Sequence, residues 1–240
     1  MMMSSEVLKL LNYIALLFPA FLFVFTFKGF FRALVAKLMG DRTAQDDGFL
    51  SLNPLAHVDL FGITSTLVLI FFLGLFLGNA MPRGTLMLLI IILGIQWSYT
   101  PPMNATNFKY YKLGGILTTI SGSIGLFLFA LILLVGMRLI NMTQLAPNIL
   151  TSLRNLLYMT VELATWFCVV NLVPIPPFAG GQLLYFLLPQ SQQHIFEWLE
   201  NYSTYIFLGL LFLPGVSDIF WGSLYMLQFL VKNFLFNLVF

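Results

Sequence analysis

Apolar runs that are too long for a soluble domain dominate this sequence. Phe61–Met81 contains no charged residue, and neither does Leu113–Met137. A helix that crosses the hydrocarbon core of a bilayer needs about 20 consecutive, mostly apolar residues. Only 8% of the 240 residues are charged, whereas roughly 25% are charged in a soluble domain. We therefore predict an all-α, multi-pass transmembrane helical bundle.

The apolar runs predict about six to seven spans. They are Val7–Phe27, Phe61–Met81, Thr85–Trp97, Leu113–Met137, Pro147–Val173, Tyr205–Leu213 and Ile219–Phe240. The first run exceeds the apolar region of a signal peptide, which is about 7–15 residues long, so we expect it to be retained. It continues as an amphipathic stretch to Met39, and Gly40 is a plausible helix stop. The count stays open at the short run Thr85–Trp97 and at Pro214.

The basic residues predict an orientation. Lys28 and Arg42 follow the first span, and Lys109 and Lys112 precede the fourth. If 61–97 is a two-helix hairpin, both groups lie on one side, which the positive-inside rule places in the cytoplasm. We expect a bacterial inner membrane, with an organelle inner membrane as the alternative. The net charge of +2 forms no basic stripe, so no nucleic-acid partner is expected.

Two charged residues interrupt the run Pro147–Val173. Arg154 and Glu162 are eight residues apart and so share one helix face. We expect Arg154 to reach the membrane interface and Glu162 to form hydrogen bonds inside the bundle. A small transporter, the least favoured function, would need a chain of such groups, which the sequence lacks.

Three stretches carry recognisable motifs in a fixed order. The first is Lys28–Asp41 followed by Leu52–Asp59, the second is Thr100–Asn104 followed by Asn107-Phe108, and the third is Asn171–Gly181. In this order and spacing they resemble the site-2 protease family of intramembrane zinc metalloproteases. The resemblance implies a single integral membrane domain over 1–240, with a protease-like core at 28–188 and a C-terminal hairpin at 203–240. Its candidate loop-motif residues are Asn53, Pro54, His57, Asp59, Asn171, Pro174, Gly180 and Gly181.

The chain departs from the family where the zinc chemistry resides. The family's helical His-Glu-x-x-His motif binds zinc through two histidines, and its glutamate acts as general base. Aligned on this chain, those positions are Lys28, Gly29 and Arg32, and the third ligand position is Ala179. Lysine and arginine only donate hydrogen bonds at neutral pH, and glycine and alanine offer no ligand. We therefore predict no metal, no cofactor and no enzymatic activity.

The two histidines give one alternative. His57 lies near Asp59, and His194 and Glu197 form an i, i+3 pair. A catalytic zinc usually has three protein ligands. We interpret His57 as a loop residue and His194 as part of a solvated interfacial helix. An active intramembrane metalloprotease with a rearranged site, built on either histidine, is the alternative.

Lys28 and Arg32 are four residues apart and share a helix face. They could bind lipid phosphates at the cytoplasmic interface, or pair with an acidic residue of a partner or of this chain. The candidates in this chain are Asp41, Asp46, Asp47 and Asp59. The stretch Pro174–Gly181 cannot form a continuous helix, and we expect it to pack against the Leu52–His57 loop and the Lys28–Arg32 segment.

These observations together predict a binding function. We expect a catalytically inactive, site-2-protease-like membrane protein that acts as a scaffold, accessory subunit or regulator. Its expected partners are the lipid bilayer and other integral membrane proteins or a larger membrane complex.

Overall fold

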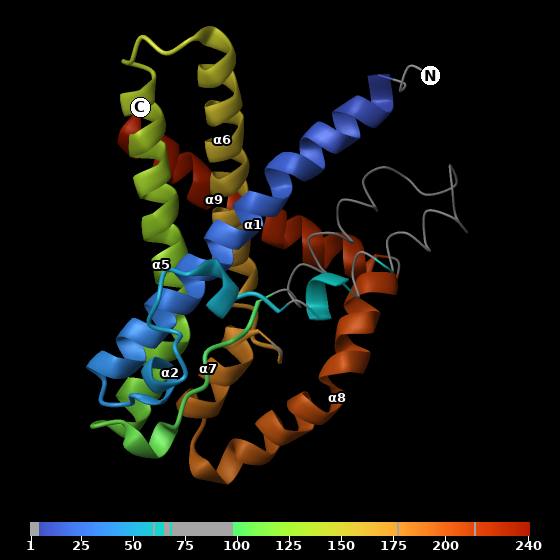
Figure 1. Ribbon diagram of the computed structural model, residues 1–240. Coiled ribbons are helices and arrows are strands. Elements are labelled where there is room, and N and C mark those ends of the chain that lie inside the picture. Colours follow the sequence, from blue (N-terminus) through green and yellow to red (C-terminus); the bar gives the residue numbers. More distant parts are fainter. Residues whose placement is uncertain (1–4, 60, 65–67, 69–97, 177, 214) are drawn as a thin grey trace.

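The computed structural model describes residues 5–59, 61–64, 68, 98–176, 178–213 and 215–240 (Figure 1). Within these ranges the regular structure is helical, apart from one isolated bridge between Val58 and Ser98. The all-α prediction is therefore confirmed. The elements are α1 (Ser5–Leu38), α2 (Thr43–Asp46), η1 (Pro54–Ala56), η4 (Ala105–Asn107), α5 (Tyr111–Ile140), α6 (Pro147–Val170), α7 (Ala179–Leu187), η5 (Gln190–Gln192), α8 (Gln193–Phe212) and α9 (Val216–Val239).

Four helices in the described part of the chain are long and apolar enough to cross a membrane. They are Ala15–Leu38 of α1, all of α5, all of α6 and all of α9. The chain is therefore a multi-pass membrane protein. Most of the predicted spans Phe61–Met81 and Thr85–Trp97 lies outside the described residues. The predicted short run Tyr205–Leu213 forms the C-terminal part of α8, which starts earlier, at Gln193.

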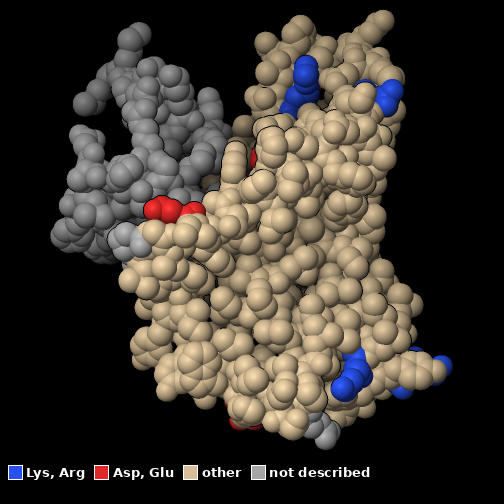
Figure 2. Space-filling model, turned by 180° about the vertical axis from the view of Figure 1, so that it is seen from behind, with Lys and Arg blue, Asp and Glu red and all other residues tan. Residues whose placement is uncertain are grey.

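Charge on the molecular surface agrees with a membrane band. Figure 2 shows lysine and arginine side chains gathered toward the two ends of the visible face, with a band free of them between. Arg138 and Arg154 belong to α5 and α6, near the loop that joins these helices, whereas Lys109 precedes the opposite end of α5. The basic side chains visible on this face thus lie where headgroups at the two edges of a membrane would solvate their charge.

Helix α1 ends at a glycine, as the sequence predicts. Gly40 has a φ of +111°, a conformation that side chains with a Cβ rarely adopt. Its N–H donates to the Lys37 carbonyl at 3.0 Å, and the Asp41 N–H donates to the Ala36 carbonyl at 2.9 Å. These two bonds form a Schellman motif, which satisfies carbonyls that the helix end would otherwise leave unpaired.

The core lies where α1 crosses α5 and α6 (Figure 1). Phe25 of α1 is fully buried and meets Phe167 of α6 edge to face, with ring centroids 5.2 Å apart. Phe27 of α1 stacks on Phe129 of α5 at 3.8 Å. Such aromatic pairs stabilise a core by about 0.5–1.5 kcal/mol beyond the area that they bury.

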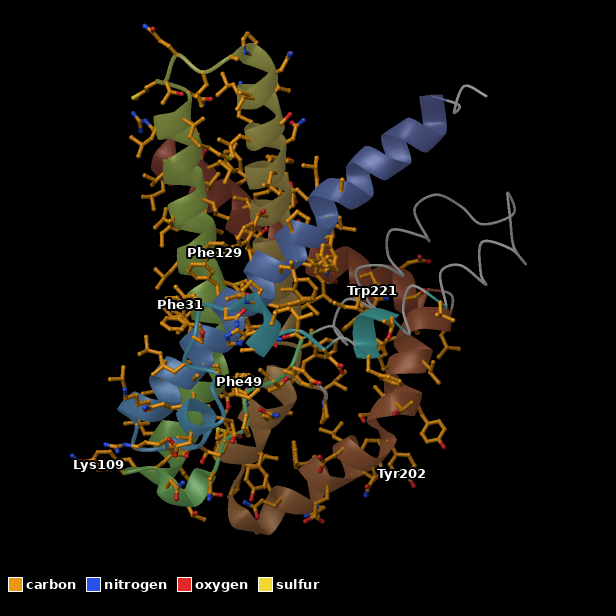
Figure 3. The ribbon with its side chains drawn as sticks, in the orientation of Figure 1. Phe31, Phe49, Lys109, Phe129, Tyr202 and Trp221 are labelled. Atoms are coloured by element: carbon orange, nitrogen blue, oxygen red, sulfur yellow. The ribbon has the colours of Figure 1, made fainter. Side chains whose placement is uncertain are left out.

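Glycines on α5 let the neighbouring elements approach closely. A Cβ added to Gly125 would lie 2.5 Å from Cγ of Phe31 on α1, and one added to Gly115 would lie 2.3 Å from Cε1 of Phe186 on α7. Figure 3 shows Phe31 and Phe129 beside this crossing. Small residues on membrane helices commonly serve this purpose, because they let two backbones come close.

The charges of α6 behave as the sequence predicts. Arg154 is exposed, whereas Glu162 accepts hydrogen bonds from Gln228 at 2.9 Å and from Lys232 at 2.5 Å. Both partners belong to α9, so this ion pair fastens α9 to α6. Gln228 also donates to the Thr165 hydroxyl at 3.1 Å. The partners of Glu162 were not predicted, because they lie more than sixty residues away in the sequence.

Helix α6 breaks at a loop and the chain turns into α7. The prediction of a break is confirmed, but Gly180 and Gly181 belong to the first turn of α7 rather than to the loop. The Gly180 N–H donates to the Asn171 carbonyl at 2.8 Å. A Cβ at Gly180 would lie 2.2 Å from the Leu172 carbonyl oxygen, and one at Gly181 would lie 2.5 Å from the Pro176 nitrogen. Only glycine therefore permits this contact between loop and helix.

We predict that Gly125→Ala lowers the free energy of unfolding by about 1–3 kcal/mol, because its methyl group would overlap Cγ and Cβ of Phe31. Gly136→Ala is the matched control on the same helix, since nothing lies within 4 Å of its added Cβ. For the control we expect the free energy of unfolding to increase by about 1 kcal/mol or less. Thermal unfolding in detergent, followed by circular dichroism, measures both. Equal effects of the two substitutions would contradict the close approach of α1 and α5.

Candidate functional site

Lys28 and Arg32 of α1 lie inside the bundle. Arg32 is 4% exposed, and its Nη2 donates to Oε1 of Gln182 on α7 at 2.6 Å. Its Nε is buried and has no hydrogen-bond partner. The side chain of Lys28 runs along α5, because a Cβ added to Gly122 would lie 3.4 Å from Lys28 Cγ. The pair therefore faces α5 and α7 rather than the lipid headgroups.

Polar groups from α5 and α6 adjoin Lys28. Asn171, the residue after α6, donates from Nδ2 to the Ser123 hydroxyl at 3.3 Å. The same Nδ2 would lie 3.6 Å from a Cβ on Gly122, so Asn171 and Lys28 flank this glycine. Ala179 is buried at the start of α7, three residues before Gln182. The structure thus gathers residues of the first and third motifs, together with residues of α5 and α7, into one cluster, which we call the Lys28–Arg32 cluster: Lys28, Arg32, Gly122, Ser123, Asn171 and Gln182.

Gly29 lies against His57. A Cβ added to Gly29 would lie 2.2 Å from His57 Nδ1, so the imidazole fills the space that any larger residue would need. His57 is fully buried, and its Nε2 lies 2.7 Å from the Ser51 carbonyl oxygen. Phe49 packs edge to face on the ring at 5.7 Å. Burial lowers the pKa of His57, and the hydrogen bond to Ser51 only partly opposes this, so the ring is neutral.

Asp41 connects the end of α1 to the second motif, Thr100–Asn104 with Asn107-Phe108, which we call the proline-rich loop. Its buried carboxylate accepts hydrogen bonds from the Thr43 N–H at 3.1 Å, from the Thr43 hydroxyl at 2.5 Å, from the Asn104 N–H at 2.7 Å and from Asn107 Nδ2 at 3.1 Å. Burial acts to raise the pKa of Asp41, but these hydrogen bonds outweigh it and hold the pKa below its usual value. The first two motifs therefore meet through Asp41, and the predicted pairing of Asp41 with Lys28 or Arg32 is wrong.

The other predicted loop residues have structural roles. The Asn53 side chain accepts from the Leu55 N–H at 3.1 Å and caps η1, which begins at Pro54. Asp59 accepts from the Phe61 N–H at 2.9 Å. Pro174 is exposed in the α6–α7 loop.

The predicted packing of Pro174–Gly181 on the Lys28–Arg32 segment stays a prediction, because the contacts that the structure shows there come from the flanking residues Asn171 and Gln182. The Leu52–His57 loop reaches α1 through His57, and the residue that opens the α6–α7 stretch, Asn171, lies beside Lys28. Direct contact between the Leu52–His57 loop and Pro174–Gly181 stays a prediction.

The described residues do not fit a zinc site of the kind that the resemblance implies. No three His, Cys, Asp or Glu side chains in the described part of the chain come close enough together to hold a metal ion. His57 offers one ring nitrogen, Nδ1, but this atom lies against Gly29, which has no side chain to supply a second ligand. His194 is exposed on α8, with Nδ1 3.1 Å from the Ser191 carbonyl oxygen.

The helices, the membrane-length spans and the three motifs that meet at α1 define an integral membrane protein of protease-like type. The chain is 30% identical over 203 residues to the Bacillus subtilis (strain 168) protein named Putative zinc metalloprotease YwhC, covering 83% of this chain and 81% of that one. It belongs to the family of that protein, and this relationship supports the resemblance to site-2 proteases. No protein-family model matches the chain. No solved structure matches it either.

The prediction that the chain is not an enzyme is contradicted by this relationship. Its relative bears the name of a zinc metalloprotease, and the identity extends over most of both chains. The prediction depended on only four aligned positions: Lys28, Gly29, Arg32 and Ala179. These four positions cover one site, whereas the identity to the relative extends over 203 residues.

We predict that Gly29→Ala destabilises the protein by about 1–3 kcal/mol, because the added methyl group overlaps His57 Nδ1. His57→Ala vacates that space, so Gly29→Ala should cost little in a His57→Ala background. Thermal unfolding of the two single variants and the double variant gives this coupling. Additive effects would show that Gly29 and His57 do not touch.

We predict that Asp41→Asn lowers the free energy of unfolding by about 1–3 kcal/mol, since an amide cannot accept all of these hydrogen bonds. The folded-state pKa of Asp41 lies below the ordinary 3.8. The contribution of Asp41 to the free energy of unfolding is therefore complete above pH 3.8 and is lost as the pH falls through the lowered pKa. Denaturant unfolding against pH checks this. Asp47→Asn, at an exposed residue, is the control, and an equal acid sensitivity in Asp41→Asn and in the unsubstituted protein would contradict the role of Asp41.

Proposed function

We propose that this protein binds the membrane-spanning segments of other membrane proteins, as a scaffold, accessory subunit or regulator. The observation that supports this most is the poor coverage of α9. In its apolar window 17% of the residues are buried within the bundle, against 39–56% for the other three candidate spans. Its relative is named a metalloprotease, and a protease-like protein inside a membrane must contact segments that lie there.

The outward face of α9 has a composition suited to packing against another helix. Met226 is 64% exposed, while Gln228 and Leu235 on the opposite face are buried. Tyr225, beside Met226 in the sequence, is 62% exposed. Methionine and aromatic side chains adapt their shape to different partners and bury a large area. The Glu162–Lys232 pair holds the inward face in place, so the outward face is presented in a fixed orientation.

We predict that a photo-crosslinking amino acid at Met226 forms discrete adducts with other membrane proteins in the native membrane. Ile132 of α5 is the matched control, because it is 59% exposed on another span. Gel shifts and mass spectrometry identify the adducts. Gentle purification followed by mass spectrometry should recover the same partners. Lipid adducts alone at Met226, or identical adducts at both positions, would count against a partner surface on α9.

The name of the relative favours a second function, cleavage of a membrane-embedded peptide. Stoichiometric zinc in the purified protein, lost in His57→Ala and kept in His194→Ala, would support it. Cleavage of a co-reconstituted membrane substrate with the same dependence on His57 is also required. If the purified protein contains no zinc and still retains its partners, the result would contradict cleavage and agree with the binding function.

A further inference from the structure

In the part of the chain that the structure describes, no ion pair links a carboxylate to the buried Arg32 or to the partly buried Lys28. Among the residues that the structure describes, the ion pair joins Lys232 to Glu162, between α9 and α6. The carboxylate of Asp41 already accepts hydrogen bonds from Thr43 and from Asn104 of the proline-rich loop. Arg32 finds only the neutral oxygen of Gln182, and its Nε donates to nothing.

Burying these cations costs free energy unless an anion pairs with them. Taking an unpaired charge out of water costs several kcal/mol even after relaxation, and charged side chains within spans normally pair with one another or mark a functional site. The neutral oxygen of Gln182 does not cancel the charge of Arg32. Thr118 and Thr119, one turn before Gly122 on α5, also carry buried hydroxyls without partners. The cluster therefore lacks an acceptor that bears negative charge.

The depth of the pair indicates which anion fits. Lys28 precedes the helix stop Gly40 by twelve residues, or up to about 18 Å along the helix at 1.5 Å per residue. The hydrocarbon core is about 30 Å thick, so Lys28 lies well below the phosphates. Basic residues nearer the polar end of α1, the exposed Lys37 and Arg42, are better placed for headgroups. An acidic side chain on a membrane-spanning segment reaches the depth of Lys28.

Lys28 is the more accessible of the two cations: its side chain is partly covered, whereas Arg32 is 4% exposed. A carboxylate would meet the ammonium group first and the guanidinium group next. Ion-paired carboxylates accept short, charge-assisted hydrogen bonds from both groups.

We propose that Lys28 and Arg32 form a buried receptor site for the carboxylate of an Asp or Glu in a partner's membrane-spanning segment. This inference rests on the proposed function and gives its partner a chemical property. Gln182 orients the guanidinium group, and Asn171 with Ser123 fixes the floor of the site beside Gly122. A segment without an acidic residue at the matching depth would leave both cations uncompensated.

The test compares two synthetic membrane-spanning peptides that differ only in a central Glu or Gln. Each carries a fluorophore and is reconstituted with the full chain in lipid nanodiscs, at a pH at which the glutamate is ionised. The Glu peptide is expected to bind at least tenfold more tightly than the Gln peptide. Lys28→Met and Arg32→Gln should abolish this preference, and Lys37→Gln, at an exposed residue of the same helix, should keep it.

The outcomes separate the inference from the proposed function. Equal binding of the two peptides to the unsubstituted protein overturns the carboxylate site, while adducts at Met226 would still support partner binding. Loss of the preference when phosphatidylglycerol is added assigns the site to lipid phosphate and also overturns it. Lys28→Met removes an unpaired charge, so in the absence of peptide its unfolding temperature should be equal to or above that of the unsubstituted protein. A clear decrease would show that Lys28 is a structural residue, against the inference.

Discussion

The close approach of α1 to α5 is the contact on which the rest of the structure depends. Gly125 lacks the side chain that would otherwise hold the two helices apart, and Phe31 occupies the space that results. Phe27 can then stack on Phe129, and Phe25 reaches Phe167 on α6. Van der Waals packing of this kind drives helix association in lipid, where apolar burial alone gives little.

Within that packing, each buried polar group needs a partner of its own. Asp41 obtains four hydrogen bonds by drawing the proline-rich loop onto the end of α1. Glu162 obtains its partners by docking α9 on α6. The same requirement makes Arg32 conspicuous, since its hydrogen bond goes to the neutral oxygen of Gln182 and its Nε has no partner. Polar satisfaction thus explains the loops and the placing of α9, and the incomplete case at Arg32 is the one from which we propose a receptor site for a partner's carboxylate.

The family relationship and the local geometry answer different questions. Identity over most of the chain to a protein named a zinc metalloprotease shows where this scaffold comes from. The geometry shows what the region around Lys28 and Arg32 contains: a histidine against Gly29, a guanidinium bonded to Gln182, and a glycine pair that packs α7 onto its loop. The name of the relative favours the proposal of cleavage, whereas the exposed face of α9 favours the proposal that membrane-spanning segments bind.

The sequence by itself determined the helical class, the spans in α5, α6 and α9, the glycine stop of α1 and the family motifs. These follow from local properties, because apolar length and backbone freedom belong to neighbouring residues. It also predicted that Glu162 would find hydrogen bonds inside the bundle. Tertiary structure alone decided that Lys232 and Gln228 supply them, that His57 fills the space at Gly29, and that Arg32 meets Gln182 rather than an aspartate. Such partners lie far apart in the chain, and the rotation and crossing of whole helices determine which side chains meet.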